Sequence, residues 1–336
     1  MSETTSTQIH LASRPTGWPT QQNFSVEHVE LADLKAGEVR VRNEFVSVDP
    51  YMRGRMNDTR SYVKPFQIGE QIAGGAVGRV IASEDSSLPV DTLVLHQLGW
   101  SDLAQGPAAS FKEIPDLPGV PNSLRLHILG MTGLTAYVGL KAVAGLVEGE
   151  TVFISGAAGA VGTAAGQIAK LMGAKRVIGS AGSAEKVELL TTKYGYDAAF
   201  NYKDGDVRGQ LAAAAPEGID VFFDNVGGDH LEAALAAFND GGRAALCGAI
   251  SSYNTTEKTP GPDNMANLIT RGLKMQGFTL SSYLNYGEEF SQVMGQWFAE
   301  GKISYDETIV DGVENTVQAF VDMMGGANTG KMLVRI

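Results

Sequence analysis

The chain has 336 residues, enough for two domains that each bury a core of their own. Acidic side chains outnumber basic ones by 38 to 26, the formal net charge is −12, and no dense Lys/Arg cluster marks a nucleic-acid binder. The lone cysteine, Cys247, excludes disulfide scaffolds and cysteine-based structural zinc sites, and its apolar neighbours predict an inert, buried thiol. Short apolar runs and a polar N-terminus without a signal peptide's apolar core predict a cytoplasmic protein with no transmembrane helix.

Roughly the first 125 residues predict an irregular, strand-dominated domain. Residues 37–50 alternate apolar and polar side chains, as a half-buried strand does. Residues 72–83 and 91–100 are further short β-rich runs broken by glycines.

From Leu126 on, the pattern alternates between helices and strands, beginning with helical spacing over 127–146. Such alternation indicates parallel βαβ units. The predicted strands are 151–155, 176–180, 198–202, 218–227, 242–250, 273–280 and, in the tail, 331–336. The predicted helices include 160–173, 184–195, 230–238 and, in the tail, 314–324.

The segment TVFISGAAGAVGTAAGQIAKLMG, residues 151–173, places glycines between a predicted strand and a predicted helix. A dinucleotide-binding loop has the spacing G-x-G-x-x-G in this context. Gly159 and Gly162 hold the second and third places, whereas the first falls on Ala157, one residue after Gly156. The helix N-terminus would offer N–H groups to a pyrophosphate. A simple tight turn is the alternative.

The end of the second predicted strand bears on the choice of dinucleotide. NAD sites usually carry Asp or Glu there, to hold the ribose 2′-hydroxyl. Ser180 stands in that place, Lys186 lies one turn into the following helix, and Tyr202 ends the third strand. A missing carboxylate near a cation favours NADP over NAD, unless Lys186 is only a solvated helix-face lysine.

The whole layout resembles the medium-chain dehydrogenase/reductases. That resemblance implies an α/β fold: a Rossmann doubly wound parallel sheet over 127–303, plus a β-rich GroES-like catalytic domain over 1–126 and 304–336. Zinc-dependent members have a cysteine and a histidine where this chain has Ser47 and Glu70. The resemblance therefore implies a zinc-independent member, with no metal ligands.

Within that family the chain is most similar to the NADP-dependent alkenal/one double-bond reductases, the group of prostaglandin, plant double-bond and curcumin reductases. The supporting stretches are VDPYMRGRM (48–56), GMTGLTAY (130–137), AAGAVG (157–162), AGSAEKV (181–187), FNYK (200–203), FDNVGG (223–228), CGAISSYN (247–254) and MQGF (275–278). One departure is Thr132, where many relatives have proline.

The resemblance implies which residues contact NADP, and a homodimer that pairs through 273–280. The implied contacts are Met131, Thr135, Gly159, Ala160, Val161, Gly162, Ser180, Gly182, Lys186, Tyr202, Asn225, Cys247, Gly248, Ala249, Ile250, Ser251, Ser252, Tyr253, Phe278, Thr279, Leu280 and Asn328. Residues 278–280 are expected to back the cofactor as a strand.

The implied reaction is NADPH-dependent reduction of the carbon–carbon double bond of an enone or alkenal. Tyrosine is a suitable donor to the carbonyl oxygen, because its pKa near 10 keeps it protonated at neutral pH. The resemblance favours Tyr253 as proton donor or enolate stabiliser and Tyr51, expected to face the site from the N-terminal domain, as an assisting group. A quinone reductase of the same superfamily and a non-catalytic NADPH-binding protein are the alternatives.

Two further motifs imitate other families. Tyr137 and Lys141 spell the YxxxK pair of short-chain reductases, but they precede the glycine loop instead of following it. GGANTGKM, residues 325–332, nearly spells a P-loop, but a helix precedes it, a strand follows, and Met332 replaces the hydroxyl residue. We therefore interpret the YxxxK spacing as chance, and GGANTGKM as a helix end followed by a turn and not as an ATP site. GGANTGKM is expected to close the NADP site from the opposite domain.

Overall fold

The computed structural model describes residues 4–336, which form two compact units. Unit 1 contains the residues up to His127 together with 307–328 and 332–336. Unit 2 contains 128–306 together with 329–331. The three residues 329–331 thus belong to unit 2, although their neighbours on both sides belong to unit 1.

Unit 1 is built almost entirely from antiparallel strands. Strands β1 and β2 pair with each other, and a second sheet has the order β14-β15-β3-β4-β5-β7, with β6 also on β3. The strands are β1 (Thr5–Leu11), β2 (Phe24–Glu30), β3 (Glu38–Ser47), β4 (Ala76–Ser83), β5 (Leu93–His96), β6 (Leu103–Pro107), β7 (Lys112–Glu113), β14 (Glu307–Asp311) and β15 (Lys331–Arg335). The helices are α1 (Tyr51–Arg55) and α9 (Thr316–Met324). Alternating residues of β3, Val39 and Val41, are fully buried in the core of this sheet, as period-2 patterning requires.

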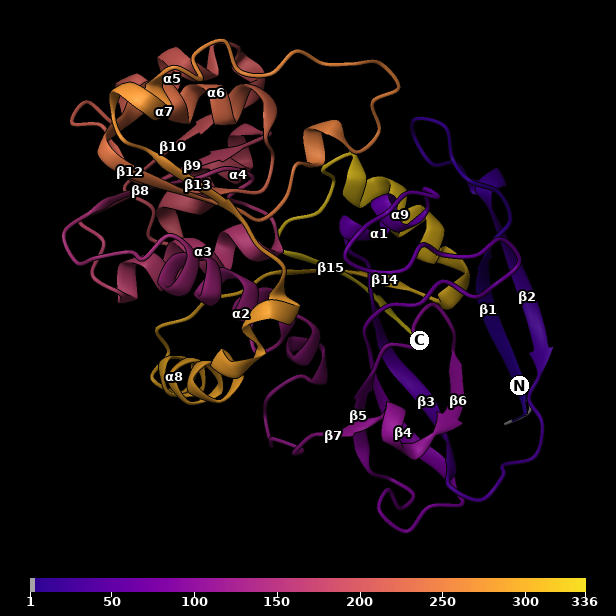
Figure 1. The fold of residues 1–336 in the computed structure, drawn as a ribbon. Helices are drawn as coiled ribbons and strands as arrows, with labels where there is room; N and C mark the ends of the chain where they lie inside the picture. The colour runs from indigo at the N-terminus through magenta and orange to yellow at the C-terminus, as the bar shows by residue number, and fades with distance from the viewer. Residues whose placement is uncertain (1–3) are drawn as a thin grey trace. The chain divides into compact units, whose positions relative to one another are not determined.

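Unit 2 contains a six-stranded sheet of order β10-β9-β8-β11-β12-β13, in which every pair is parallel (Figure 1). The strands are β8 (Thr151–Ile154), β9 (Arg176–Ala181), β10 (Ala198–Asn201), β11 (Ile219–Asp224), β12 (Phe238–Leu246) and β13 (Lys274–Gly277). This is the Rossmann order, whose switch point lies between the first and fourth strands, here β8 and β11. Ligands of such sheets bind beyond the carboxyl ends of the strands at that point.

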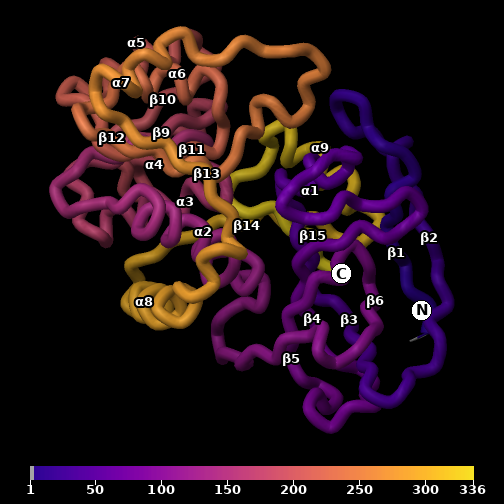
Figure 2. Tube along the Cα trace, in the orientation of Figure 1, coloured from indigo at the N-terminus to yellow at the C-terminus, as the bar shows by residue number. Residues whose placement is uncertain are grey.

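Helices cover both faces of this sheet. Their bounds are α2 (Met131–Val138), α3 (Ala160–Leu171), α4 (Ala184–Thr192), α5 (Val207–Ala214), α6 (Gly228–Ala237), α7 (Asn267–Thr270) and α8 (Gly287–Ala299). Helices α5 and α6 lie on one face and α2 and α3 on the other, as the ribbon and the tube both display (Figures 1 and 2). The stacked rings of Phe153 and Phe222, 5.0 Å apart, form the centre of the core under α5 and α6.

Several predicted elements end differently in the structure; the predicted strand 218–227, for example, ends at Asp224. Strand β13 stops at Gly277, so 278–280 are not the strand expected, and a 3-10 helix begins at Leu280. Strand β12 stops at Leu246 and not at 250. The expected helix 127–146 begins only at Met131 and widens into a π-turn over Gly139–Val143. Across residues 4–336, every helix falls short of the length and apolar character that crossing a membrane requires.

Candidate active site

The glycine loop connects β8 to α3 at the switch point of the sheet. Gly159 is the N-cap of α3, and no side chain caps the N–H groups of the first turn. Gly162 packs against the loop so closely that a Cβ there would lie 2.5 Å from the Gly156 oxygen. Glycine at 162 therefore lets the helix start directly above the loop. This leaves the helix N-terminus, with its positive dipole, open to an anion.

A second group of predicted residues gathers where β9 and β10 end. Ser180 is fully buried, and its hydroxyl has no hydrogen-bond partner. The ring of Tyr202 covers Gly182, where a Cβ would lie 3.0 Å from the tyrosine hydroxyl. Lys186 stands in the first turn of α4, whose N-cap Ser183 accepts its backbone N–H at 3.3 Å.

The same corner carries a second cation, Lys203, which sequence reasoning did not select. Burial, and then the positive charge of Lys203, lower the pKa of Lys186. Two like charges close together repel each other, and a phosphate on a ribose 2′-oxygen bound beside them would offset that repulsion. The signal in the sequence was present, because Lys203 directly follows Tyr202 in FNYK.

Asp224, the last residue of β11, organises the ends of β8 and β11. Its side chain is buried, and Oδ1 accepts hydrogen bonds from the Ser155 hydroxyl at 2.7 Å and from the N–H groups of Val226 and Gly227, both at 2.9 Å. Asn225 Nδ2 donates a further hydrogen bond to the backbone oxygen of Ser155, at 2.8 Å. The two strand ends at the switch point are therefore locked together. Burial raises the pKa of the Asp224 carboxyl, although all three donors oppose this.

The segment 247–253 is tied to this same centre. The N–H groups of Cys247 and Gly248 donate to the Asp224 backbone oxygen, at 2.8 and 3.0 Å. Ser251 donates its hydroxyl to the Val226 oxygen at 2.6 Å, and the Ile250 N–H donates to the Asn225 oxygen at 3.3 Å. The predicted contacts Asn225 and 247–252 thus form one connected loop system in the structure.

Tyr253 closes this loop with its ring half-buried. Its hydroxyl oxygen accepts the N–H of Ala249 at 3.3 Å. Burial raises the pKa of this phenol, and the nearby Cys247 and Asp224 push it the same way, so the hydroxyl is protonated at neutral pH. Burial also raises the pKa of the Cys247 thiol to about 12, which agrees with an inert cysteine.

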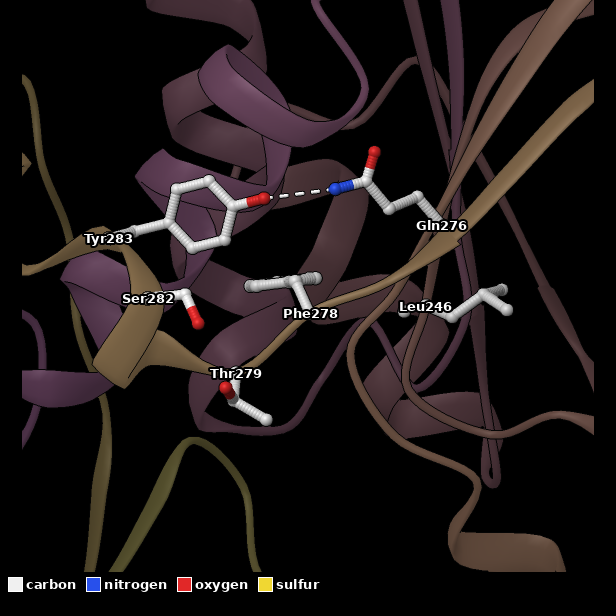
Figure 3. A pocket seen from close by; sticks show the side chains of 7 residues that line it. Leu246, Gln276, Phe278, Thr279, Ser282 and Tyr283 are labelled. Carbon is white, nitrogen blue, oxygen red and sulfur yellow. Dashed lines mark hydrogen bonds between the residues drawn. The ribbon is translucent and has the colours of Figure 1, made fainter. Parts of the chain in front are cut away.

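A cavity of about 520 Å³ opens at the carboxyl ends of β12 and β13 (Figure 3). Phe278 is one of its lining residues and packs edge-on against Phe223, with 6.3 Å between ring centroids. Beside it, Gln276 donates from Nε2 to the Tyr283 hydroxyl at 2.9 Å. The complete lining is Leu246, Gln276, Gly277, Phe278, Thr279, Ser282 and Tyr283. The predicted contacts Phe278 and Thr279 therefore face the cavity from a loop.

Other predicted residues have local partners that the sequence did not reveal. Thr135 donates its hydroxyl to the Met131 oxygen at 2.7 Å, so this hydroxyl is engaged inside α2, and Met131 is 39% exposed. Tyr137 and Lys141 both bind the carboxylate of Glu289 on α8, which makes the YxxxK pair a link between α2 and α8.

Tyr51 and Asn328, the two predicted residues of unit 1, are described within that unit. Tyr51 begins helix α1 directly after Pro50. Burial, followed by the negative charge of Asp49, raises the pKa of the Tyr51 phenol, so it too is protonated at neutral pH. Asn328 is the last residue of unit 1 before the chain enters unit 2 at Thr329.

Comparison with known proteins agrees with this architecture. Residues 7–114 match the family described as the N-terminal domain of oxidoreductase, and residues 160–300 match the zinc-binding dehydrogenases. NADPH-dependent curcumin reductase from Escherichia coli K12 is 41% identical over 333 residues, which cover 97% of this chain and 95% of the relative. NADP(+)-dependent 2-alkenal reductase from Nicotiana tabacum is 39% identical over 341 residues, covering 99% and 98%. The crystal structure of CurA in complex with NADPH from Vibrio vulnificus matches with a TM-score of 0.92 at 41% identity, over 98% of both chains.

The chain therefore belongs to the medium-chain dehydrogenase/reductases, in the group that contains curcumin reductase and 2-alkenal reductase. It is an oxidoreductase. The predicted family is confirmed, and so is the predicted fold class, a Rossmann sheet with a β-rich N-terminal region. The predicted cofactor, NADP, agrees with the names of these relatives.

One of the two family descriptions names zinc, and the donors of this chain do not fit a zinc site. Ser47 is buried and donates its hydroxyl to Asp49, whereas Glu70 is exposed. Within residues 4–336, no three His, Cys, Asp or Glu side chains gather where they could hold a metal ion. Zinc in proteins is held by three or four such groups, so no zinc is assigned here.

Proposed function

We propose that this protein uses NADPH to reduce the carbon–carbon double bond of α,β-unsaturated ketones and aldehydes. The observation that carries the proposal is the Tyr253 hydroxyl, which accepts a hydrogen bond from Ala249 and is protonated beside the carboxyl ends of the Rossmann strands. The named activities of the 2-alkenal and curcumin reductases that it resembles support the substrate class.

The residues of unit 2 would hold the cofactor along the strand ends. The N-terminus of α3, Gly159 to Gly162, binds the pyrophosphate. Lys186 and Tyr202, joined by Lys203, bind the 2′-phosphate next to Ser180, whose buried hydroxyl has no hydrogen-bond partner. The loop from Asn225 and the segment 247–253 border the nicotinamide ribose, and Phe278 to Leu280 lie on the other side. Met131, Thr135 and Asn328 complete the proposed contacts.

NADPH, when bound, supplies a hydride to the β-carbon of the substrate. As that C–H bond forms, the π electrons of the double bond move toward the carbonyl and leave an enolate. The Tyr253 hydroxyl donates a hydrogen bond to the enolate oxygen, and a proton delivered through Tyr253 or from water completes the saturated ketone. Tyr51 assists by binding the substrate. The protein's contribution is position and a neutral donor, since neither tyrosine ionises at neutral pH.

The test is a substrate panel with NADPH and NADH side by side, following absorbance of the reduced nicotinamide. We expect 2-alkenals and enones to be reduced, with NADPH strongly preferred. Turnover of 1,4-quinones far above aliphatic enones would instead favour a quinone reductase. A protein that binds NADPH but oxidises it with no member of the panel would be a non-catalytic binder, and the proposal would be wrong.

We also propose that the two units are the two expected domains, with limits near 1–126 plus 304–336, GroES-like, and 127–303. Two copies would pair through β13, because it is an edge strand of the six-stranded sheet and, within residues 4–336, no strand pairs with its outer side. Light scattering of the purified protein, compared with a variant carrying proline at Met275, tests this pairing: the wild type should be a dimer and the variant a monomer.

A further inference from the structure

The tail tripeptide 329–331 lies against the glycine loop. The Gly330 N–H donates to the Ala158 oxygen at 2.8 Å, and Gly330 forms a parallel β-bridge with Gly159. Ala158 and Gly159 directly precede helix α3, so this bridge acts on the start of the helix. The tripeptide thereby adds one isolated β-bridge to the loop that would hold a pyrophosphate.

Only glycine fits at position 330. Its φ is +64°, in the region that favours glycine, and a Cβ would lie 1.9 Å from the backbone oxygen of Asp306. The same oxygen accepts the N–H of Lys331 at 3.1 Å. The tripeptide is therefore pressed between the glycine loop and Asp306.

Asp306 is itself held in place within unit 2. Its carboxylate accepts a hydrogen bond from the Tyr194 hydroxyl at 2.6 Å and forms an ion pair with the Lys193 ammonium at 2.7 Å. Tyr194 is almost completely buried, so its hydroxyl is a fixed point. A chain of contacts thus runs from Tyr194 through Asp306 and Gly330 to Ala158.

We propose that Gly330 is a positioning residue for pyrophosphate binding, acting through Ala158 and Gly159. This deepens the proposed function and rests on it. Residues 329–331 would fix the position of the glycine loop relative to α3. They would thereby fix the direction in which the N–H groups of the first turn of α3 point. Residues 329–331, at the end of the near-P-loop, would then support dinucleotide binding through the glycine loop and not by cradling phosphates as a P-loop does.

The experiment compares Gly330→Ala with Gly326→Ala in the full-length protein. Gly326 is a matched control, because its φ is +77° and no atom lies within 4 Å of a Cβ built there. Both variants carry similar backbone strain, but only the first disturbs the loop. Affinity is measured by titration with NADPH and, separately, with adenosine 2′-monophosphate, which carries the 2′-phosphate but no pyrophosphate.

We expect Gly330→Ala to raise the Kd for NADPH about tenfold or more and to leave the Kd for adenosine 2′-monophosphate unchanged. Gly326→Ala should change neither. Equal NADPH affinity in the two variants would overturn the inference, and so would an equal loss for both ligands in Gly330→Ala. Should Gly330→Ala fail to fold, Tyr194→Phe, which removes only the hydroxyl on Asp306, should raise the NADPH Kd roughly threefold with the same selectivity. No binding of NADPH to the wild type would refute the proposed function, and this inference with it.

Discussion

At the scale of single residues, the hydroxyl of Tyr253 differs from those of Tyr137 and Tyr194 in its hydrogen-bond partner. The Tyr137 hydroxyl donates a hydrogen bond to the Glu289 carboxylate, and the Tyr194 hydroxyl donates one to the Asp306 carboxylate. The Tyr253 oxygen instead accepts from the Ala249 N–H, which leaves its own proton for another acceptor. Among these three phenols, Tyr253 is therefore the one suited to donate to a substrate oxygen.

Replacing Tyr253 by phenylalanine removes that proton without changing the ring. We expect kcat for enone reduction to fall about 100-fold, as loss of a general acid commonly does, while the Kd for NADPH changes less than about twofold. Steady-state kinetics and NADPH titration measure the two quantities. Tyr51→Phe should raise KM for the enone with a smaller effect on kcat. Full activity in Tyr253→Phe would rule out its proposed role.

Lys186 bears on the choice between NADPH and NADH. Its ammonium would contact the 2′-phosphate, so Lys186→Ala should raise the Kd for NADPH about 10- to 100-fold and leave that for NADH unchanged. Lys175, which precedes β9 and pairs with Glu217, provides the control: Lys175→Ala should alter neither Kd. Fluorescence titration with both cofactors gives the answer, and equal losses for NADPH and NADH would contradict the assignment.

At the scale of elements, the approach of α3 to the glycine loop depends on the absence of a side chain. At Gly162 a Cβ would lie 2.5 Å from the Gly156 oxygen and 2.6 Å from the Ala157 Cα. Both neighbours are backbone atoms, so they cannot rotate away as a side chain could. A larger residue would have to push the helix off the loop.

We therefore expect Gly162→Ala to lower the Tm by several degrees, about 2–4 °C for each 1 kcal/mol lost, and to weaken NADPH binding. Gly295 in α8 is the matched helical control, since no atom lies within 4 Å of a Cβ built there. Gly295→Ala should raise stability by roughly 0.5–1 kcal/mol through higher helix propensity. Differential scanning calorimetry compares the two, and a stable, tightly binding Gly162→Ala would show that the helix can shift at no cost.

At the scale of the whole molecule, two buried histidines couple stability to pH. Burial lowers the pKa of His96 and of His230 to about 4. His96 is fixed as the neutral form, because its Nδ1 accepts the Leu98 N–H while Nε2 faces Asn43 Oδ1 at 2.8 Å. An unfolded histidine titrates near 6.5. Between these two pKa values, the unfolded chain binds protons that the folded chain does not. The contribution of each neutral histidine to the free energy of unfolding is therefore complete above about pH 6.5 and is lost as the pH falls toward 4.

The free energy of unfolding falls by on the order of 3 kcal/mol for each histidine over this pH range. We expect the Tm to be flat above about pH 7 and to fall steeply between pH 6.5 and 4. His230→Phe, whose ring can stack on Phe153 as the imidazole does, should make that fall smaller. Thermal unfolding at a series of pH values tests this, and an unchanged slope in the variant would contradict a buried, neutral His230.

The sequence was sufficient for features that depend on local patterns. The strand–glycine–helix segment was located to the residue, with α3 beginning at Ala160, and the alternation after Leu126 became the parallel sheet. The ends of elements were harder. Residues 278–280 include the β-prone Phe278 and Thr279, yet the strand stops at Gly277, because Phe278 packs on Phe223.

What the sequence by itself determined is the family, the fold class and the type of cofactor, because these follow from short motifs whose chemistry is local: glycines before a helix, a serine in place of an acid, a lysine after it. What only the tertiary structure decided is which groups meet. Asp224 joins Ser155, through its carboxyl, to the 247–253 loop, through its backbone oxygen. Lys203 stands beside Lys186, and Gly330 bonds to Ala158 across more than half of the chain. These contacts join residues far apart in the sequence, so their positions depend on the packing of whole strands and helices, which no local pattern encodes.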